Sequence, residues 1–177
     1  MKKTTIIVIA FFILSSCQEK KEIHISEAAL AELKAYDDSQ KIEKNTKEFI
    51  KNYVNDANSI DWKTKLPQYL SSNINEFVEE HSAYRNSFHN YKSTIKHLTV
   101  SGNEGTVWLS ITATYAENYD FENSGYGDEL FNGIDAKNQN LTWDEIWYFN
   151  VVDGKFGDKW DFMKDNYKIM KDLKAAE

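Results

Sequence analysis

The sequence predicts an α+β fold in which helices come first and an antiparallel sheet follows. Two observations carry this prediction. Between Ile42 and Phe88 apolar residues recur at the spacing of helix faces, and after Phe88 they alternate with polar residues as in strands. Short connections that contain glycine separate the alternating segments, which is typical of a meander of three or four antiparallel strands.

The helical part contains three segments. The first has one apolar stripe that must be buried, formed by Ile42, Thr46, Phe49, Ile50, Tyr53 and Val54. Pro67 fits the first turn of a short helical piece that ends near Leu70. Ser72 or Asn73 would cap the third segment. Its apolar stripe consists of Ile74, Phe77, Val78, His81, Tyr84 and Phe88.

The strands are expected in two hairpins. Residues 91–100 and 106–115 form the first pair, with 101–105 as its tight connection, and 141–152 and 155–163 form the second pair around the turn Asp153-Gly154. A loop rich in glycine, asparagine and acidic residues, 117–140, interrupts the sheet. Residues 166–173 are expected to close the chain as a short helix.

The N-terminus has the pattern of an export signal. Lys2 and Lys3 precede an apolar run, 6–14, that is too short to span a bilayer. The run ends in Leu14-Ser15-Ser16-Cys17, which resembles the lipobox of bacterial lipoproteins. The resemblance implies a signal peptide over 1–16 and a diacylglycerol on the sulfur of Cys17. The alternative is an ordinary secretory signal with a chance cysteine.

The anchor sets the expected location and domain organisation. Cys17 is the single cysteine, so the exported part has no disulfide. We expect a tether over 17–41, with a short helix that Ser26 would cap, and one domain over 42–177. The protein would lie in the cell envelope, extracytoplasmic and bound to the membrane through the lipid on Cys17. Because Gln18 is not the aspartate that retains some lipoproteins at the inner membrane, we favour the outer membrane.

Composition excludes several classes of partner. The net charge is −7 and lysine and arginine do not cluster, so a nucleic-acid partner is not expected. His81, His89 and His97 are eight residues apart, which matches no common metal-ligand spacing, so no metal is expected. We also expect no cofactor, because a glycine-rich phosphate loop is lacking. Aromatic residues make up 14% of the chain, enough to fill a core and also to line an apolar ligand pocket.

Three stretches resemble the SnoaL-like branch of the nuclear-transport-factor-2-like (cystatin-like) superfamily. They are Phe88-His89-Asn90-Tyr91-Lys92, the strand 106–115, and Val151-Val152-Asp153-Gly154-Lys155-Phe156 leading to Trp160. The resemblance covers about 42–173. It implies a curved antiparallel sheet wrapped around the N-terminal helices as a cone, with a pocket at the open end. The family includes polyketide cyclases, isomerases, dehydratases and domains without a known reaction.

The catalytic residues that the resemblance implies are replaced here. In SnoaL-like cyclases an aspartate about four residues after the tryptophan is the general acid/base, and this position is Lys164. A histidine often follows the threonine of the middle strand, and here Tyr115 follows Thr114. Two candidates remain. Asp165 would reach the position of the family's aspartate if the strand has a one-residue bulge; otherwise it caps the closing helix. His81 is either a general base in the pocket or a residue at the edge of the core.

We expect the pocket on the strand faces that mix aromatic and polar side chains. We expect the ligand to contact residues from both hairpins and the third helix: Tyr84, Phe88, Trp108, Thr112, Thr114, Tyr148, Asn150 and Trp160. The alternative is that the faces of Trp108 and Tyr148 are the solvent side of the sheet. Asp161 falls on the face opposite Trp160, where the sheet could pair two copies as a homodimer.

Three functions are compatible with these patterns. The first is binding of a small apolar or aromatic ligand without turnover. The second is a cofactor-independent cyclase, isomerase or dehydratase that uses Asp165 or His81. The third is a structural or partner-binding envelope lipoprotein. The replaced acid/base and histidine positions favour the first and third over an enzyme.

Overall fold

The computed structural model describes residues 26–120, 131 and 133–174. The chain divides into two compact units, 1–35 and 36–177. In the first unit Ser26 caps helix α1 (Glu27–Ala57), since its Oγ accepts the N–H of Ala29 at 3.2 Å. The helix expected to be short is thus the start of a 31-residue helix. Cys17 and the signal peptide lie outside the described residues, and none of the described helices is long and apolar enough to cross a membrane.

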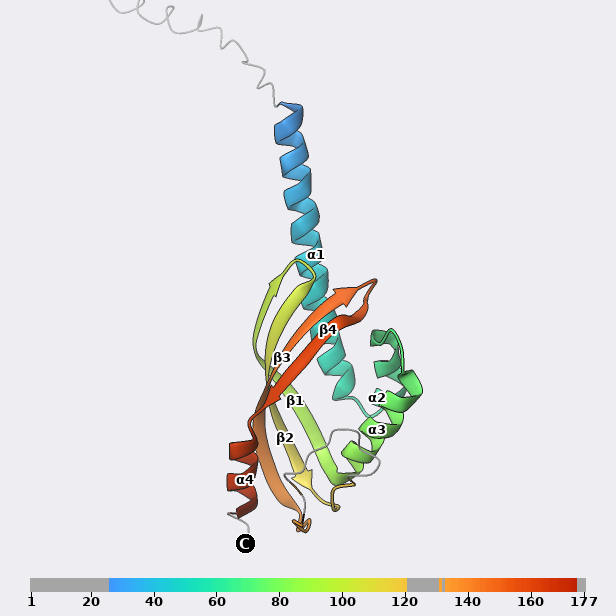
Figure 1. The fold of residues 1–177 in the computed structure, drawn as a ribbon, viewed down its shortest axis with the longest axis vertical. Helices are drawn as coiled ribbons and strands as arrows, with labels where there is room; N and C mark the ends of the chain where they lie inside the picture. The colour runs from blue at the N-terminus through green and yellow to red at the C-terminus, as the bar shows by residue number, and fades with distance from the viewer. Residues whose placement is uncertain (1–25, 121–130, 132, 175–177) are drawn as a thin grey trace, which may run out of the picture. The chain divides into compact units, whose positions relative to one another are not determined.

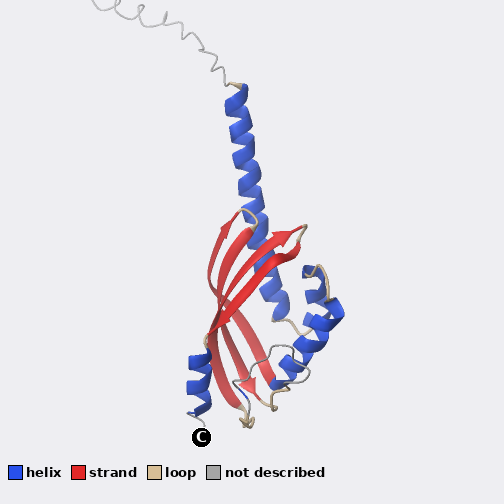
Figure 2. Cartoon of the chain, viewed as in Figure 1, coloured by secondary structure: helices blue, strands red, loops and turns tan. Residues whose placement is uncertain are grey.

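The second unit has the expected α+β order. After α1 come helices α2 (Trp62–Lys65) and α3 (Ile74–Ser87), with a 3₁₀ helix η1 (Leu66–Tyr69) between them. The strands are β1 (Phe88–Ser101), β2 (Glu104–Tyr115), β3 (Gln139–Val152) and β4 (Lys155–Lys164), and helix α4 (Asn166–Lys174) follows. The four strands form one antiparallel sheet in the order β1-β2-β3-β4 (Figures 1 and 2). This confirms the predicted class, a curled antiparallel sheet with helices packed on it.

Both predicted hairpin turns are present. Gly102 follows β1 with φ +60°, a left-handed conformation that glycine adopts without strain. Asp153 and Gly154 both have positive φ, 51° and 73°, as a two-residue turn of type I′ requires. Of the loop expected over 117–140, residues 121–130 and 132 are outside the described part of the chain, and β3 begins at Gln139.

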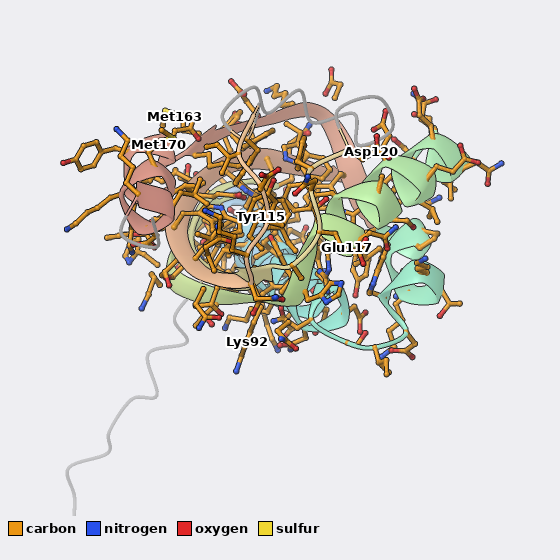
Figure 3. All side chains as sticks on the ribbon, turned by 90° about the horizontal axis from the view of Figure 1, so that it is seen from below. Lys92, Tyr115, Glu117, Asp120, Met163 and Met170 are labelled. Atoms are coloured by element: carbon orange, nitrogen blue, oxygen red, sulfur yellow. The ribbon has the colours of Figure 1, made fainter. Side chains whose placement is uncertain are left out.

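The core lies between α1 and the concave face of the sheet. On β2 Val107, Leu109 and Ile111 are fully buried, and the residues between them face outward. From α1, Phe49 and Tyr53 meet the ring of Phe156 on β4 edge-to-face, each with 4.9 Å between ring centres. An end-on view shows the sheet curling around a dense cluster of side chains that includes Tyr115 (Figure 3).

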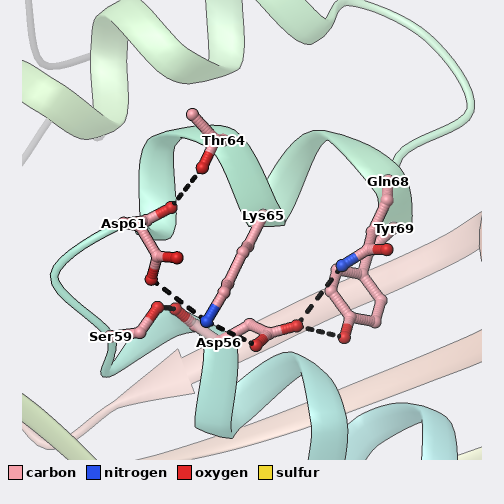
Figure 4. A network of polar contacts seen from close by, with 7 residues as sticks. All are labelled: Asp56, Ser59, Asp61, Thr64, Lys65, Gln68 and Tyr69. Carbon is pink, nitrogen blue, oxygen red and sulfur yellow. Dashed lines mark hydrogen bonds and ion pairs between the residues drawn. The ribbon is translucent and has the colours of Figure 1, made fainter.

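A polar network fixes α2 and η1 against the end of α1 (Figure 4). The carboxylate of Asp56 accepts the Tyr69 hydroxyl at 2.6 Å and the Gln68 amide at 3.3 Å. Lys65 lies between two carboxylates, 3.6 Å from Asp56 and 3.0 Å from Asp61. The network matters for the site because the same short helices carry Trp62, which packs beside α3.

Helix α4 continues the sheet edge where β4 ends. The last paired residue of β4, Lys164, lies opposite Glu145 on β3. Beyond it, the N–H of Asp165 donates to the carbonyl of Asp144 at 2.9 Å, and the Asp172 carboxylate accepts the N–H of Thr142 at 3.0 Å. Asp165, which precedes α4, and Asp172, within it, thus bond to two backbone groups of β3 that a longer β4 would otherwise pair with.

Candidate functional site

A cavity of about 380 Å³ lies between α1, α3 and the concave face of the sheet. This volume is within the usual range for small-molecule sites. Its walls are mainly aromatic, with three charged side chains among them. The lining residues are Tyr53, Val54, Ala57, Phe77, Glu80, His81, Tyr84, Tyr91, Ser93, Glu145, Trp147, Trp160, Phe162 and Lys164.

Glu145 is the buried charged residue of this cavity. It points inward from β3 and is only 6% exposed. Its Oε1 accepts the indole N–H of Trp143 at 2.8 Å, and its Oε2 accepts the indole N–H of Trp147 at 2.8 Å. Because each carboxylate oxygen can accept two hydrogen bonds, this arrangement fixes the carboxylate and leaves it capacity for a ligand.

Three aromatic rings surround His81 on α3. Phe77 stacks on it with 5.3 Å between ring centres, Trp62 meets it edge-on at 4.8 Å, and Tyr84 lies at 6.2 Å. Burial, together with the nearby charge of Arg85, lowers the pKa of His81 to about 3. The imidazole is therefore neutral near pH 7 and is a weak base there.

Two further polar groups of the cavity are Lys164 on β4 and Tyr53 on α1. Lys164 lies directly opposite Glu145 in the strand register, and its Nζ is 5.5 Å from the centre of the Tyr84 ring. Tyr53 is buried, and burial followed by the charge of Glu145 raises the pKa of its hydroxyl well above the usual range. Tyr53 therefore stays protonated and can donate a hydrogen bond.

Three of the predicted catalytic and ligand-pocket residues line the cavity: His81, Tyr84 and Trp160. Trp160 is partly buried and stacks on Phe156 with 4.3 Å between ring centres. Phe88 is fully buried instead, packed between Tyr84 and Tyr115 at 4.6 and 5.6 Å. It belongs to the core beneath the cavity and is not part of its lining.

The pocket face assigned to β2 and β3 was wrong. Trp108 and Tyr148 are 44% and 39% exposed on the outer face, and Thr112 and Thr114 lie on that face too. Alternation separates two faces but does not say which is inside. Here the inner positions carry the apolar and aromatic side chains that cover α1. The outer aromatic residues gain partial cover from neighbours, as when the Tyr148 hydroxyl donates to Glu104 at 2.6 Å.

Asn150 and Asp165 are also placed outside the cavity. Asn150 is buried, but its Oδ1 accepts the N–H of Lys159 at 3.0 Å and so holds a bulge of β4. Asp165 is exposed and caps α4, since its Oδ1 accepts the N–H of Lys168 at 3.1 Å. The bulge precedes Trp160, so it does not move Asp165 inward, and Lys164 faces the cavity in its place.

Sequence reasoning missed Glu145 and Trp147. A signal was present, because Leu141, Trp143, Glu145, Trp147 and Phe149 alternate along one face of β3. A glutamate among apolar and aromatic residues on one strand face indicates a buried carboxylate when its neighbours on that face carry N–H donors. Among the described residues no group of three or more histidine, cysteine or acidic side chains could hold a metal ion.

Comparisons with known proteins give similarity in structure only. No family model matches the chain, and no curated protein sequence is similar to it. A protein from Acidithiobacillus ferrooxidans assigned as a polyketide cyclase superposes with a TM-score of 0.61 at 12% identity, covering 75% of this chain and 96% of that one. AclR from Streptomyces galilaeus, assigned as a hydroxylase, gives 0.58 at 14% identity over 75% and 83%.

A third neighbour bears the family name. A protein from Jannaschia sp. CCS1, assigned as a SnoaL-like polyketide cyclase, gives a TM-score of 0.55 at 15% identity and covers 76% of this chain and 94% of that one. Each match spans most of the neighbour's length, and sequence identity is too low to carry over residues or reactions. The chain therefore has the fold of these SnoaL-like proteins.

Proposed function

We propose that this domain binds a small, largely apolar ligand in the aromatic cavity and does not convert it. One observation carries the proposal: an aromatic-walled cavity of about 380 Å³ holds the carboxylate of Glu145, and two indole N–H groups fix that carboxylate in position. Apolar walls with a few placed polar groups are what small-molecule sites have in common. The ligand packs against Tyr84, Trp147 and Trp160 and donates a hydrogen bond to Glu145.

Binding without turnover is supported by the state of the candidate bases. His81, with a pKa of about 3, is too weak a base to accept a proton at neutral pH. Asp165 caps α4 outside the cavity, and Lys164 stands where the resemblance implies an aspartate. Each carboxylate oxygen of Glu145 already accepts a hydrogen bond from an indole N–H, so the carboxylate is held in place as an acceptor.

The test is capture of the ligand from the native source. Protein purified from its own envelope under mild conditions is analysed by native mass spectrometry, and we expect a bound mass that Trp160→Ala and Trp147→Ala lose. The control is Trp108→Ala, which removes an exposed tryptophan on the other face and should keep the mass. Equal loss in all three variants, or the mass in none of the proteins, contradicts the proposal.

An enzyme remains the second candidate, because Glu145, Lys164 and the Tyr53 hydroxyl line one cavity. In that case Glu145 would be the base of a cofactor-free lyase or isomerase, in place of Asp165 or His81. The same experiment separates the two functions. If the domain only binds, wild type and Glu145→Gln retain the same compound. If it is an enzyme, wild type retains the product, and Glu145→Gln retains a substrate of different mass or structure.

Anchoring and assembly belong to the same proposal. The sequence Leu14-Ser15-Ser16-Cys17 supports lipid attachment at Cys17 and a place in the cell envelope, with the outer membrane favoured. A homodimer through the sheet is supported by an outward row of register partners, Trp108, Ile146 and Met163, which are 44%, 40% and 67% exposed. Sedimentation of wild type against Met163→Lys checks it, and an unchanged monomer in both would rule it out.

A further inference from the structure

A second cavity adjoins the first. It is an open groove of about 400 Å³ between the residues that precede α3, the first turns of α3, and the bulged part of β4, and its residues 71–73 and Glu76 are exposed to solvent. Three residues line both cavities: Phe77 and Glu80, one turn apart on α3, and Trp160 on β4. The two spaces are therefore neighbours across a shared wall of two aromatic rings and one carboxylate.

The two cavities differ in chemistry. The first has aromatic walls that include Trp147, Tyr84 and Tyr91, and it carries the ammonium group of Lys164. The polar part of the second consists of Ser71, Ser72, Asn73 and Glu76 together with the shared Glu80. None of the residues that line the second cavity in the described chain carries a positive charge.

Asn73 shows that this polar part is not simply a helix cap. It is the residue before α3 and has a left-handed φ of 54°, but its side chain makes no capping hydrogen bond to the helix. Its amide therefore does not serve the role that asparagine usually has at this position. The hydroxyls of Ser71 and Ser72, the amide of Asn73 and the two carboxylates line a space that shares Phe77, Glu80 and Trp160 with the first cavity.

We propose that the ligand is amphiphilic and occupies both cavities. This inference rests on the proposed function and deepens it. The apolar body lies in the first cavity, and a polar arm passes Phe77 and Trp160 into the second. Because Glu76 and Glu80 only accept hydrogen bonds and repel anions, the arm is one that donates hydrogen bonds, through hydroxyl or ammonium groups, and is not anionic. Glu80 stands where body and arm join.

Four probes with one naphthalene body test the arm. They are 2-methoxynaphthalene, which has the body alone, 2-naphthyl β-glucoside, 2-(2-naphthyloxy)ethylamine and 2-naphthyloxyacetate. Dissociation constants are measured with the purified protein by NMR titration. Each hydrogen bond gained is worth roughly 2- to 10-fold in affinity. We expect the glucoside and the amine to bind at least roughly 5-fold tighter than 2-methoxynaphthalene, and the oxyacetate to bind no tighter.

A matched pair of variants locates the arm. Glu76→Gln should reduce the advantage of the amine, while Glu79→Gln, the same change of charge at an exposed position of α3 outside both cavities, should not. Equal affinity for all four probes, or tightest binding of the oxyacetate, overturns the inference and leaves the binding function standing. Failure of all four probes to bind contradicts the proposed function, and the amphiphile falls with it.

Discussion

Glu145 and His81 are ionisable residues in one aromatic cavity, and their surroundings hold them in different ways. The carboxylate of Glu145 is held in position by hydrogen bonds, because the indoles of Trp143 and Trp147 each donate to one of its oxygens. His81 is kept by ring contacts with Phe77 and Trp62, in surroundings that disfavour its charged form. The first residue can recognise a donor on a ligand, while the second serves as part of the wall.

Replacing Glu145 tests its structural share of this arrangement. Glu145→Ala should lower the free energy of unfolding by roughly 2–4 kcal/mol, because two indole N–H groups lose their acceptor in a buried place. Glu145→Gln should cost less, since its amide oxygen still accepts one of them. Urea unfolding measures both variants. If Glu145→Ala costs no more than Glu145→Gln, the two N–H bonds are not what holds the residue.

The low pKa of His81 predicts how stability depends on pH. Its pKa is about 3 in the folded protein, while an unfolded histidine titrates near its ordinary value of ~6.5. Between these values the unfolded chain binds the extra proton, so stability is fully present above about pH 6.5 and falls as pH drops towards 3. Within this range, the contribution of His81 to the free energy of unfolding falls by up to about 1.4 kcal/mol for each pH unit.

The matched variant is His81→Gln, which keeps a neutral polar side chain. Carboxylates that titrate in the same range are common to both proteins and cancel in the comparison. We therefore expect the difference in urea unfolding free energy between wild type and variant to change by roughly 1–2 kcal/mol in favour of the variant from pH 6 to pH 4.5. A difference that is constant with pH would mean that His81 protonates freely in the folded protein.

Among the elements, the β3–β4 hairpin shapes the wall of both cavities through its bulge. Phe149 pairs with Trp160 and Val151 with Phe156, so Asn150 alone lies opposite the three residues 157–159. Asn150 fills the bulge, and a Cβ added at Gly157 would lie 2.3 Å from its Oδ1. Glycine at this position is therefore required by the close approach of the Asn150 side chain.

This contact predicts a non-additive pair of substitutions. Gly157→Ala should destabilise the protein by roughly 1–3 kcal/mol, the usual cost of overpacking. In an Asn150→Ala background the same change should cost much less, because the side chain that it would strike is gone. A double-mutant cycle by urea unfolding measures the coupling. Additive costs would place the strain of Gly157→Ala in the backbone instead.

Trp160 and Trp108 give the sheet's two faces a direct comparison. Trp160 is partly buried and stacked on Phe156, so Trp160→Ala should cost about 2–4 kcal/mol, near the lower end of values for buried aromatic residues. Trp108 is 44% exposed, and Trp108→Ala should cost about 1 kcal/mol or less. Thermal and urea unfolding check both values. A larger loss for Trp108 would mean that the outer face is covered by a partner.

For the whole molecule, the sequence predicted the order of elements better than the site. Strand period and turn chemistry placed both hairpins within a few residues, since Asp153-Gly154 allows little other than a tight turn. The predicted pocket face of the sheet was the outer one. Alternation separates two faces without identifying the buried one, and both faces of β2 carry large apolar side chains, Trp108 on the outer face and Val107 on the inner. Glu145 was missed although its two indole donors lie two residues away on either side, because alternation alone does not say that their face of β3 is the buried one.

The lipid anchor is a prediction about the intact chain, and it concerns residues outside the described part. Cys17→Ala should release the protein from the membrane fraction or leave it with an uncleaved signal, because two or three acyl chains provide the anchoring energy. Detergent phase partitioning and the mass of the mature N-terminus measure this. Cys17→Ala protein that still partitions into detergent as a cleaved product would exclude the lipobox.

Helix α4 protects this domain against aggregation at high protein concentration. It packs along β3 beyond the end of β4, where Asp165, just before the helix, donates its N–H to the carbonyl of Asp144, and Asp172 accepts the N–H of Thr142. A chain that ends before Asn166 would present this stretch as a free strand edge, a template for pairing with another molecule. We expect that truncation to associate through intermolecular β-structure, visible as thioflavin-positive aggregates. Asp172→Asn should leave the full-length protein soluble, because Asp165 and the helix body still shield the edge.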